Sequence, residues 1–408
     1  MELAPGSHAW WQYKQSPEWV SEGTDKCRVT FWWRDPQGDE STSPVRRVWL
    51  YITGVTDHHQ RAVPQSLQRI PGTDAWTWST SLSSSWRGSY CFIPSISDND
   101  FSEAVMQGDM SDKMALREGW RRLLPQAIAD PLNPLFWRGG RGHPVSGLEL
   151  PNAPEQPGWK NTQVAYTEPL CINWHSEHLH NTRRVWVYTT GEASDPAERP
   201  LAILLDGEFW AQSMPVWPVL QSLTLAGQLP AAVYVLIDAI DTAHRSRELP
   251  CNQDFWLAVK NELLPHIAQL EPFHPGPQNT VVAGQSFGGL ASLYAALHWP
   301  DHFGCALSLS GSYWWPNRGE NMDGELIRQI KSGQIPVGHP RIILEAGLRE
   351  PLIFRANQAM YTQLQHTQHE VLWRQFDGGH DALCWRGGLT RGLKTLWSSL
   401  LVSKPCFS

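Results

Sequence analysis

Lysine is scarce in this sequence: eight of its 33 basic residues are Lys, and the other 25 are Arg. The 40 acidic residues outnumber them and give a formal net charge of −7. Because no global positive field is present to hold a phosphate backbone, nucleic-acid binding is not expected. The sequence also lacks any run of about 18 apolar residues, which excludes a membrane-spanning helix.

Cysteine is sparse and scattered, and no CxxC or CxH cluster occurs. Such clusters are typical of structural zinc sites, so no metal site is expected. The N-terminal sequence has no basic stretch followed by an apolar one, the pattern of a secretory signal. Free thiols and a cytoplasmic location are therefore predicted. The cysteines are Cys27, Cys91, Cys171, Cys251, Cys305, Cys384 and Cys406.

Planar side chains are abundant by contrast. The 23 Trp outnumber the 12 Phe and the nine Tyr together. Trp supplies a large apolar face with one donor, and Arg supplies a planar fork of donors, a pairing that suits anionic aromatic ligands. Ordinary core packing is the alternative explanation of this composition.

The 408 residues are enough for two or three domains. Residues 27–94 contain short β-type runs separated by turn clusters, which predict a small antiparallel β-sandwich. A helix is predicted at residues 111–124, and the Pro- and Gly-rich tract 130–158 is interpreted as the interdomain linker. The predicted domains are residues 1–150, the sandwich with its linker, and residues 151–408.

Beyond the linker, strand-like runs alternate with helical patterns, which is typical of an α/β domain with a mostly parallel sheet. The strand candidates are residues 183–190, 200–207 and 231–239 and the runs NTVVAGQ, CALSLSG, RIILEAG and EVLWRQF. The helix candidates are residues 255–270, 288–298, 323–332, 351–366 and 383–401. The predicted fold class is therefore α/β, preceded by an antiparallel β-sandwich.

The strongest local signal is a G-x-S-x-G motif at residues 284–288, between the apolar strand NTVV and the helical pattern GLASLYAALHWP. Strand, sharp turn and helix are the context that a nucleophile elbow requires. The small flanking residues let Ser286 occupy a strained turn, and the helix N-terminus favours developing negative charge. Ser286 is therefore the predicted nucleophile.

A serine hydroxyl needs a base, and in such hydrolases the order along the chain is serine, acid, histidine. His380 fits the base, because it follows the strand EVLWRQF and precedes the final helix. Glu350 is the preferred acid, since it lies three residues beyond the glycine that ends the strand RIILEAG. Asp377 and Glu345 are the alternatives for the acid.

A tetrahedral oxyanion needs two hydrogen-bond donors. The elbow supplies the backbone N–H of Phe287, and the second donor usually comes from the loop after an earlier strand. That loop is residues 206–210, where Gly207 is the candidate.

Five sequence motifs together give the chain a resemblance to the enterochelin (enterobactin) esterases, a family of the esterase D type. They are Leu205-Asp206-Gly207, Arg245-Ser246-Arg247-Glu248-Leu249, Gly284-Gln285-Ser286-Phe287-Gly288-Gly289, Ser310-Gly311-Ser312-Tyr313-Trp314-Trp315 and Gly378-Gly379-His380-Asp381. The sandwich ending in Asp130-Pro131-Leu132-Asn133-Pro134 resembles the Ig-like N-terminal domain of that family.

The resemblance covers nearly the whole chain and implies an α/β-hydrolase domain behind an Ig-like sandwich. It implies cytoplasmic hydrolysis of the trilactone backbone of a catecholate siderophore, usually iron-loaded, so that iron can be released. The family's nucleophile and histidine fall on Ser286 and His380. The partner is thus a small-molecule siderophore, ferric enterobactin, and no cofactor is expected because iron arrives with the substrate.

A ferric tris-catecholate is triply negative, so an acidic protein must hold it with local positive charge. Arg245, Arg247 and Arg349 are the candidates, because all three follow predicted strands on loops at the edge where open α/β sheets bind ligands. Trp314 and Trp315 are the candidate aromatic walls of the site. Arg138 and Arg141 of the linker are the alternative anion-holding groups.

Two other functions stay open at this stage. The chain could be another acyl esterase of the same superfamily, acting on feruloyl or glycan-linked esters. It could also be a non-catalytic carbohydrate-binding protein on an inactive hydrolase fold, although the Ser286 and His380 pair argues against that.

Overall fold

The computed structural model describes residues 3–140, 142–160, 163–317 and 323–402. The chain divides into two compact units. The first unit contains Met1–Pro154 and two short later segments, Leu348–Pro351 and Asp377–Cys384. All other residues from Glu155 onward form the second unit. The division of the sequence at residue 150 assigned both later segments to the second domain.

The first unit is a β-sandwich in which every strand pairing is antiparallel. The strand order is β1-β2-β5-β4-β3-β6-β8-β7. Strand β4 pairs with β3 through its first residues and with β5 through its last, so it connects the two sheets. The strands are β1 Glu18–Glu22, β2 Lys26–Arg34, β3 Arg47–Ile52, β4 Gln65–Arg69, β5 Ala75–Ser83, β6 Arg87–Ser95, β7 Phe136–Arg138 and β8 Pro144–Glu149.

Alternation of apolar and polar residues creates the core of this sandwich. In β2, Cys27, Val29 and Phe31 are buried while the residues between them are more exposed, as expected for a strand with one face on a core. Three helices accompany the strands: α1 His8–Tyr13, α2 Glu103–Met106 and α3 Lys113–Leu123. Helix α3 confirms the helix predicted at residues 111–124, and Asp112 caps it by accepting hydrogen bonds from two backbone N–H groups of the first turn.

The interpretation of residues 130–158 as a linker is wrong for its first two thirds. Strands β7 and β8 lie in this tract and extend the sheet beyond β6. Its Pro and Gly residues serve the sheet: Pro144 begins β8, and a Cβ on Gly147 would lie 2.8 Å from a Leu135 side-chain carbon. The tract therefore looks like a linker because close packing in the sheet requires a glycine at position 147.

The second unit is built on an eight-stranded sheet of order β16-β15-β14-β13-β11-β12-β10-β9. The strands from β16 to β12 pair in parallel, and β10 and β9 complete the sheet antiparallel. The mostly parallel sheet predicted from the sequence is confirmed. The strands are β9 Leu170–Ser176, β10 Asn181–Thr189, β11 Leu201–Leu205, β12 Val233–Ile237, β13 Thr280–Gln285, β14 Cys305–Leu309, β15 Arg341–Gly347 and β16 Glu370–Phe376.

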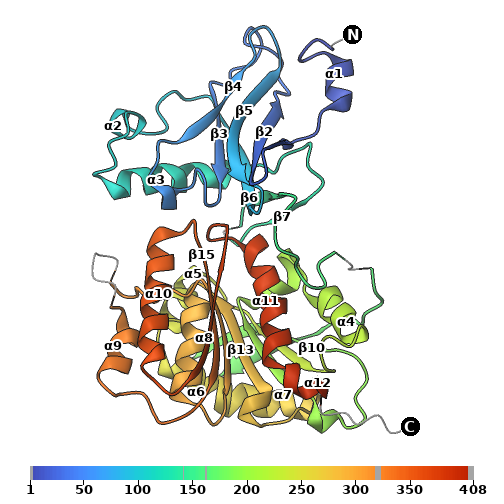
Figure 1. The fold of residues 1–408 in the computed structure, drawn as a ribbon, viewed down its shortest axis with the longest axis vertical. Helices are drawn as coiled ribbons and strands as arrows, with labels where there is room; N and C mark the ends of the chain where they lie inside the picture. Colours follow the sequence, from blue (N-terminus) through green and yellow to red (C-terminus); the bar gives the residue numbers. More distant parts are fainter. Residues whose placement is uncertain (1–2, 141, 161–162, 318–322, 403–408) are drawn as a thin grey trace. The chain divides into compact units, whose positions relative to one another are not determined.

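Helices cover both faces of this sheet (Figure 1). On one face, side chains such as Val185 and Ile203 join the core beneath α6 to α10. On the other face, the ring of Tyr188 lies 5.1 Å from that of Trp217 in α4, and Tyr234 lies 5.9 Å from Trp397 after α11. The helices are α4 Trp217–Leu225, α5 Thr242–Glu248, α6 Gln253–Ala258, α7 Leu264–Leu270, α8 Phe287–His298, α9 Glu325–Lys331, α10 Pro351–Gln365, α11 Ala382–Leu396 and α12 Ser398–Val402.

Most predicted helices are confirmed, with two divisions. The helix predicted at 255–270 is α6 and α7 joined by a wider turn, and the one predicted at 383–401 is α11 and α12. Within the described residues, none of the helices is both long and apolar enough to cross a bilayer. The six cysteines among them are free, as predicted, and Cys406 lies outside the described residues.

Candidate active site

Ser286 lies between β13 and α8 in a strained backbone conformation, with φ 58° and ψ −120°. A positive φ of this kind is rare for residues other than glycine and occurs where the surrounding structure holds it in place. Gly284 makes the turn possible, because a Cβ there would lie 2.5 Å from the carbonyl carbon of Gly288. The predicted elbow between strand and helix is therefore present in the structure.

Two backbone hydrogen bonds hold the elbow in place. The Ser286 N–H donates to the Leu309 carbonyl at 2.9 Å, and its carbonyl accepts from the N–H of Ser312 at 3.1 Å. The hydroxyl oxygens of Ser286 and Ser312 are also 3.3 Å apart. Ser312 was part of a quoted motif, but nothing in its local sequence indicated a contact with Ser286.

The predicted oxyanion donors come from the two turns that follow β13 and β11. Phe287 is the first residue of α8, where backbone N–H groups have no partner in the preceding turn. Gly207 follows β11 in a tight turn, because a Cβ there would lie 2.6 Å from the Leu236 carbonyl carbon. Asp206 before it has φ 55°, a conformation that Asp tolerates better than most residues.

A charged network connects these two turns. The Arg245 guanidinium donates to both carboxylate oxygens of Asp206, at 2.7 and 2.9 Å. The Gln285 amide donates to the same carboxylate at 3.3 Å and accepts from the Trp210 indole at 3.2 Å. Burial alone would lower the pKa of Arg245, but Asp206 raises it, so the guanidinium stays charged. The Arg245 guanidinium thus forms two hydrogen bonds with Asp206, which lies in the same turn as Gly207.

Aromatic side chains lie beside the elbow. The Phe287 and Trp314 rings are 6.0 Å apart, and the Arg245 guanidinium lies 5.5 Å from the Phe287 ring centre. Trp314 and Trp315 are both half-buried and pack against the core of the second unit. Two aromatic rings, those of Phe287 and Trp314, therefore lie beside the turn of Ser286.

The proposed base and acid meet in the first unit. His380 Nδ1 and Glu350 Oε2 are 2.7 Å apart, and the Glu350 side chain is fully buried. Glu350 follows β15 by three residues, and His380 follows β16 by four. The carboxyl ends of parallel strands share one edge of a sheet, so β15 and β16 end at the same edge as β13, the strand that Ser286 follows.

The two alternative acids have other partners. Asp377 accepts hydrogen bonds from the Arg349 guanidinium at 2.7 Å and from the Ser85 hydroxyl at 3.1 Å. Glu345 is buried in β15, 3.6 Å from Arg391. Burial raises the pKa of Glu345, and the nearby arginines partly oppose this. Glu350 is thus the carboxylate that the structure places on the histidine.

The predicted ligand-binding arginines have three different settings. Arg245 and Arg247 were expected on a loop, but both lie in α5, which begins after Asp241 because that side chain accepts from the His244 N–H. Arg247 is exposed, and Arg349 pairs with Asp377. Of the alternative pair, Arg138 ends β7 with its side chain exposed, and Arg141 lies outside the described residues.

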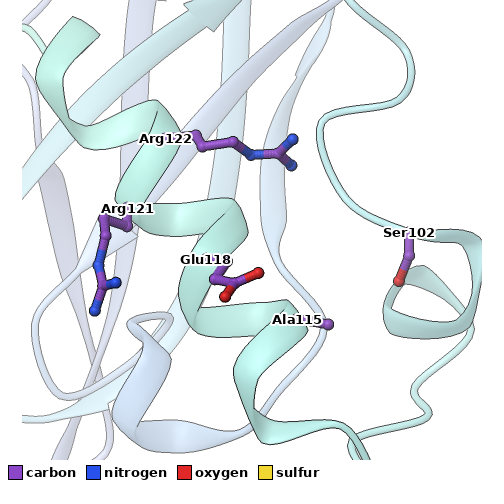
Figure 2. Close-up of a pocket in the computed structure, with 5 residues that line it drawn as sticks. All are labelled: Ser102, Ala115, Glu118, Arg121 and Arg122. Carbon is purple, nitrogen blue, oxygen red and sulfur yellow. The ribbon is translucent and has the colours of Figure 1, made fainter.

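The first unit also has a surface depression of about 360 Å³. The residues that line it are distant in sequence from Ser286, Glu350 and His380. Figure 2 shows Glu118 and Arg122 projecting from one side of α3, with Ser102 across the depression. Its charged side chains are exposed, and it contains no nucleophile with a base. Among the residues that the structure describes, no group of three or more His, Cys, Asp or Glu is arranged to hold a metal ion.

Comparison with known proteins adds family information to this geometry. Residues 28–159 match the family model described as the N-terminal domain of enterochelin esterase, and residues 176–396 match the putative esterase family. The chain is 61% identical over 398 residues to the iron(III) enterobactin esterase of Escherichia coli K12, covering 98% of both chains. This chain belongs to the enterochelin esterase family.

Solved structures of the family have the same fold. The crystal structure of ferric enterobactin esterase from Salmonella typhimurium matches with a TM-score of 0.93 and 62% identity, covering 97% of this chain and all of that one. The Shigella flexneri enterobactin esterase, crystallised in the presence of enterobactin, matches with a TM-score of 0.91 and 60% identity, covering 98% and 100%. The two-unit architecture is therefore that of the enterochelin esterase family.

Proposed function

We propose that this chain is a serine esterase that hydrolyses the trilactone backbone of ferric enterobactin to dihydroxybenzoylserine units, so that iron is released. The observation that carries the proposal is the strained Ser286 elbow in a chain 61% identical, over nearly its whole length, to iron(III) enterobactin esterases. The cytoplasmic location stays a prediction of the sequence. The high identity to iron(III) enterobactin esterases does not favour the feruloyl-ester and carbohydrate-binding alternatives.

Ser286 is the nucleophile of the proposed reaction. Its hydroxyl oxygen attacks a lactone carbonyl carbon while His380 Nε2 takes the hydroxyl proton. The carboxylate of Glu350 on Nδ1 fixes the histidine tautomer and stabilises the imidazolium that forms. The N–H groups of Phe287 and Gly207 are proposed to stabilise the oxyanion. This assignment completes the α/β-hydrolase arrangement suggested by the sheet.

An acyl-enzyme forms next and is then hydrolysed by water. The tetrahedral intermediate collapses with departure of the serine alkoxide of the substrate, which takes the proton held by His380. Water attacks the new ester on Ser286 while His380 again accepts the proton. The bond from the acyl carbon to Ser286 Oγ then breaks, Ser286 takes the proton back from His380, and the acid product leaves and ionises to a carboxylate. Three such cycles open and cut the trilactone into three units.

Mass spectrometry of the products tests this proposal. Purified protein mixed with ferric enterobactin is expected to give linear trimer, dimer and monomer of dihydroxybenzoylserine. Ser286→Ala is expected to abolish the products while ligand binding persists, because the hydroxyl contributes to the chemical step and little to ground-state affinity. His380→Ala should lose about as much activity, since residues that act as one unit are non-additive. Turnover by Ser286→Ala near the wild-type rate would reject the elbow assignment.

A further inference from the structure

The segments that carry the proposed acid and base do not belong to the second unit. Glu350 lies in Leu348–Pro351 and His380 in Asp377–Cys384, and both segments are part of the first unit. Each is short and is flanked in sequence by residues of the second unit. The segments that carry these two side chains are therefore grouped with the N-terminal sandwich.

Asp381, next to His380, is anchored to strand β6. Its carboxylate accepts from the Ser89 backbone N–H at 2.5 Å, from the Ser89 hydroxyl at 2.8 Å and from the Leu383 N–H at 2.9 Å. The side chain is buried, and burial raises its pKa while these hydrogen bonds oppose the rise. A buried carboxylate needs such partners, so the pairing with Ser89 fixes the backbone adjacent to the histidine.

Gly379, on the other side of His380, touches the turn after β3. A Cβ on Gly379 would lie 2.6 Å from the Gly54 nitrogen, and a Cβ on Gly54 would lie 2.8 Å from the Gly379 nitrogen. No Cβ fits at either position without a shift of the backbone. The histidine is thus held between two anchors, one on β6 and one on the turn at Gly54.

The segment with the acid is held by the same region of the sandwich. The Gln60 side-chain amide donates to the Arg349 carbonyl at 2.7 Å and to Asp57 at 3.0 Å. The Arg349 N–H donates to the Gly378 carbonyl at 3.0 Å, which connects the acid segment to the base segment. His59, between Gln60 and the Gly54 turn, has its ring 5.7 Å from that of His380.

We propose that the N-terminal sandwich is the positioning scaffold of the catalytic pair, acting through Ser89, Gly54 and Gln60. The inference rests on the proposed function, because it takes His380 as base and Glu350 as acid. Proton transfer depends on placement of the histidine to within about half an ångström, so the scaffold contributes to the chemical step itself. The sandwich is then a part of the catalytic machinery as well as a folded unit of its own.

Serine variants test the first anchor. Ser89→Ala removes one of three donors to Asp381 and is expected to lower kcat about tenfold while KM changes less than about threefold. Ser66→Ala is the matched control, since Ser66 is also buried in this sandwich and bonded to the backbone, through Val48 and Leu67. It is expected to lower stability without a specific loss of kcat.

Glycine variants test the second anchor. Gly54→Ala and Gly23→Ala impose the same backbone strain, because φ is +85° at Gly54 and +78° at Gly23. Only Gly54 has Gly379 against it, whereas a Cβ on Gly23 meets nothing within 4 Å. Gly54→Ala is expected to slow both turnover and the labelling of Ser286 by a fluorophosphonate, and Gly23→Ala is expected to slow neither.

Gln60→Ala is the third variant, because removal of a half-buried surface amide leaves the core of the sandwich intact. Values of kcat for Ser89→Ala, Gly54→Ala and Gln60→Ala all within twofold of the control variants would overturn the scaffold proposal. His380→Ala in the same assays separates the two hypotheses. If it is inactive the proposed function stands whatever the scaffold variants do, and if it turns over like wild type the proposed function fails.

Discussion

At the scale of single residues, the proposed role of His380 as a base depends on which carboxylate contacts its Nδ1. Glu350 is 2.7 Å from His380 Nδ1, whereas Asp377 is bonded to Arg349 and Ser85. In the proposed mechanism, Glu350 would stabilise the imidazolium formed during attack and favour the tautomer with a proton on Nδ1. The two carboxylates should differ sharply in their effect on rate.

Glu350→Gln is expected to lower kcat on the order of 100-fold or more, because the neutral amide neither stabilises the imidazolium nor enforces the tautomer. Asp377→Asn, the matched control, is expected to stay within about threefold of wild type. Steady-state hydrolysis of ferric enterobactin measures both. The opposite ranking would transfer the acid role to Asp377, and small effects from both would indicate a Ser–His dyad.

Arg245 has two possible roles that kinetics can separate. Its fork holds Asp206 in the turn that contains Gly207, so Arg245→Ala is expected to lower kcat by about ten- to a hundredfold if Gly207 is the oxyanion donor that we propose. A role in siderophore binding alone would raise KM and leave kcat unchanged.

Arg247→Ala, on the exposed side of the same helix, is the comparison for Arg245→Ala. Titration of ferric enterobactin into each variant in the Ser286→Ala background measures the binding contribution directly. A direct charge-assisted contact is worth about 1.5–3 kcal/mol, which is roughly a ten- to hundredfold change in affinity. Unchanged kcat in Arg245→Ala would argue against the anchoring role.

At the scale of elements, protonation of Asp130 makes the stability of the sandwich depend on pH. Its carboxylate accepts from the Tyr90 hydroxyl at 2.7 Å and from the Leu132 N–H, and burial raises its pKa to about 6. The ordinary value is 3.8, so the folded state binds the proton more tightly than the unfolded chain does. The resulting stabilisation is complete below about pH 4 and is lost as pH rises through about 6.

Asp130→Asn removes this titration. The free energy of unfolding of wild type relative to the variant is expected to fall by about 3 kcal/mol at most between pH 4 and pH 7. Urea unfolding followed by fluorescence at the two pH values measures the difference. A constant difference between the proteins across this range would contradict a raised pKa for Asp130.

Which elements the sequence predicted follows from how local their signals are. Strand β13, Ser286 and helix α8 are adjacent in the chain, so an apolar run and a G-x-S-x-G motif were sufficient. Helix α5 was missed because it is short and polar, and its start depends on the single cap at Asp241. The tract at 130–158 was misinterpreted because Pro144 and Gly147 are as common in linkers as at sheet edges.

The contacts that organise the candidate site are distant in sequence, which is why residue patterns did not predict them. Ser89 and Asp381 are 292 positions apart, and Arg245 and Asp206 are 39 apart. A serine in a β-strand carries no mark that it binds a carboxylate from the far end of the chain. Glu350 could be preferred from the sequence because the order of strands in such hydrolases indicates where the acid lies along the chain. No knowledge of its contacts was needed.

At the scale of the whole molecule, activity should depend on the first unit being folded. Leu67 is fully buried in its core, and Leu67→Ala is expected to cost about 2–5 kcal/mol of stability. Loss of esterase activity in urea should then follow unfolding of the sandwich, because the segments of Glu350 and His380 are part of it. Activity that persists after proteolysis has removed the unfolded sandwich would contradict this expectation.

The path of the chain has a consequence for domain shuffling between relatives. The backbone passes from one unit to the other five times, at residues 154, 347, 351, 376 and 384. A hybrid gene joined once, at Pro154, would combine the Ser89 and Gly54 of one parent with the Asp381 and Gly379 of the other. Recombination in this family should therefore succeed best when segments 348–351 and 377–384 are inherited with the sandwich, as one heritable block that is discontinuous in the gene.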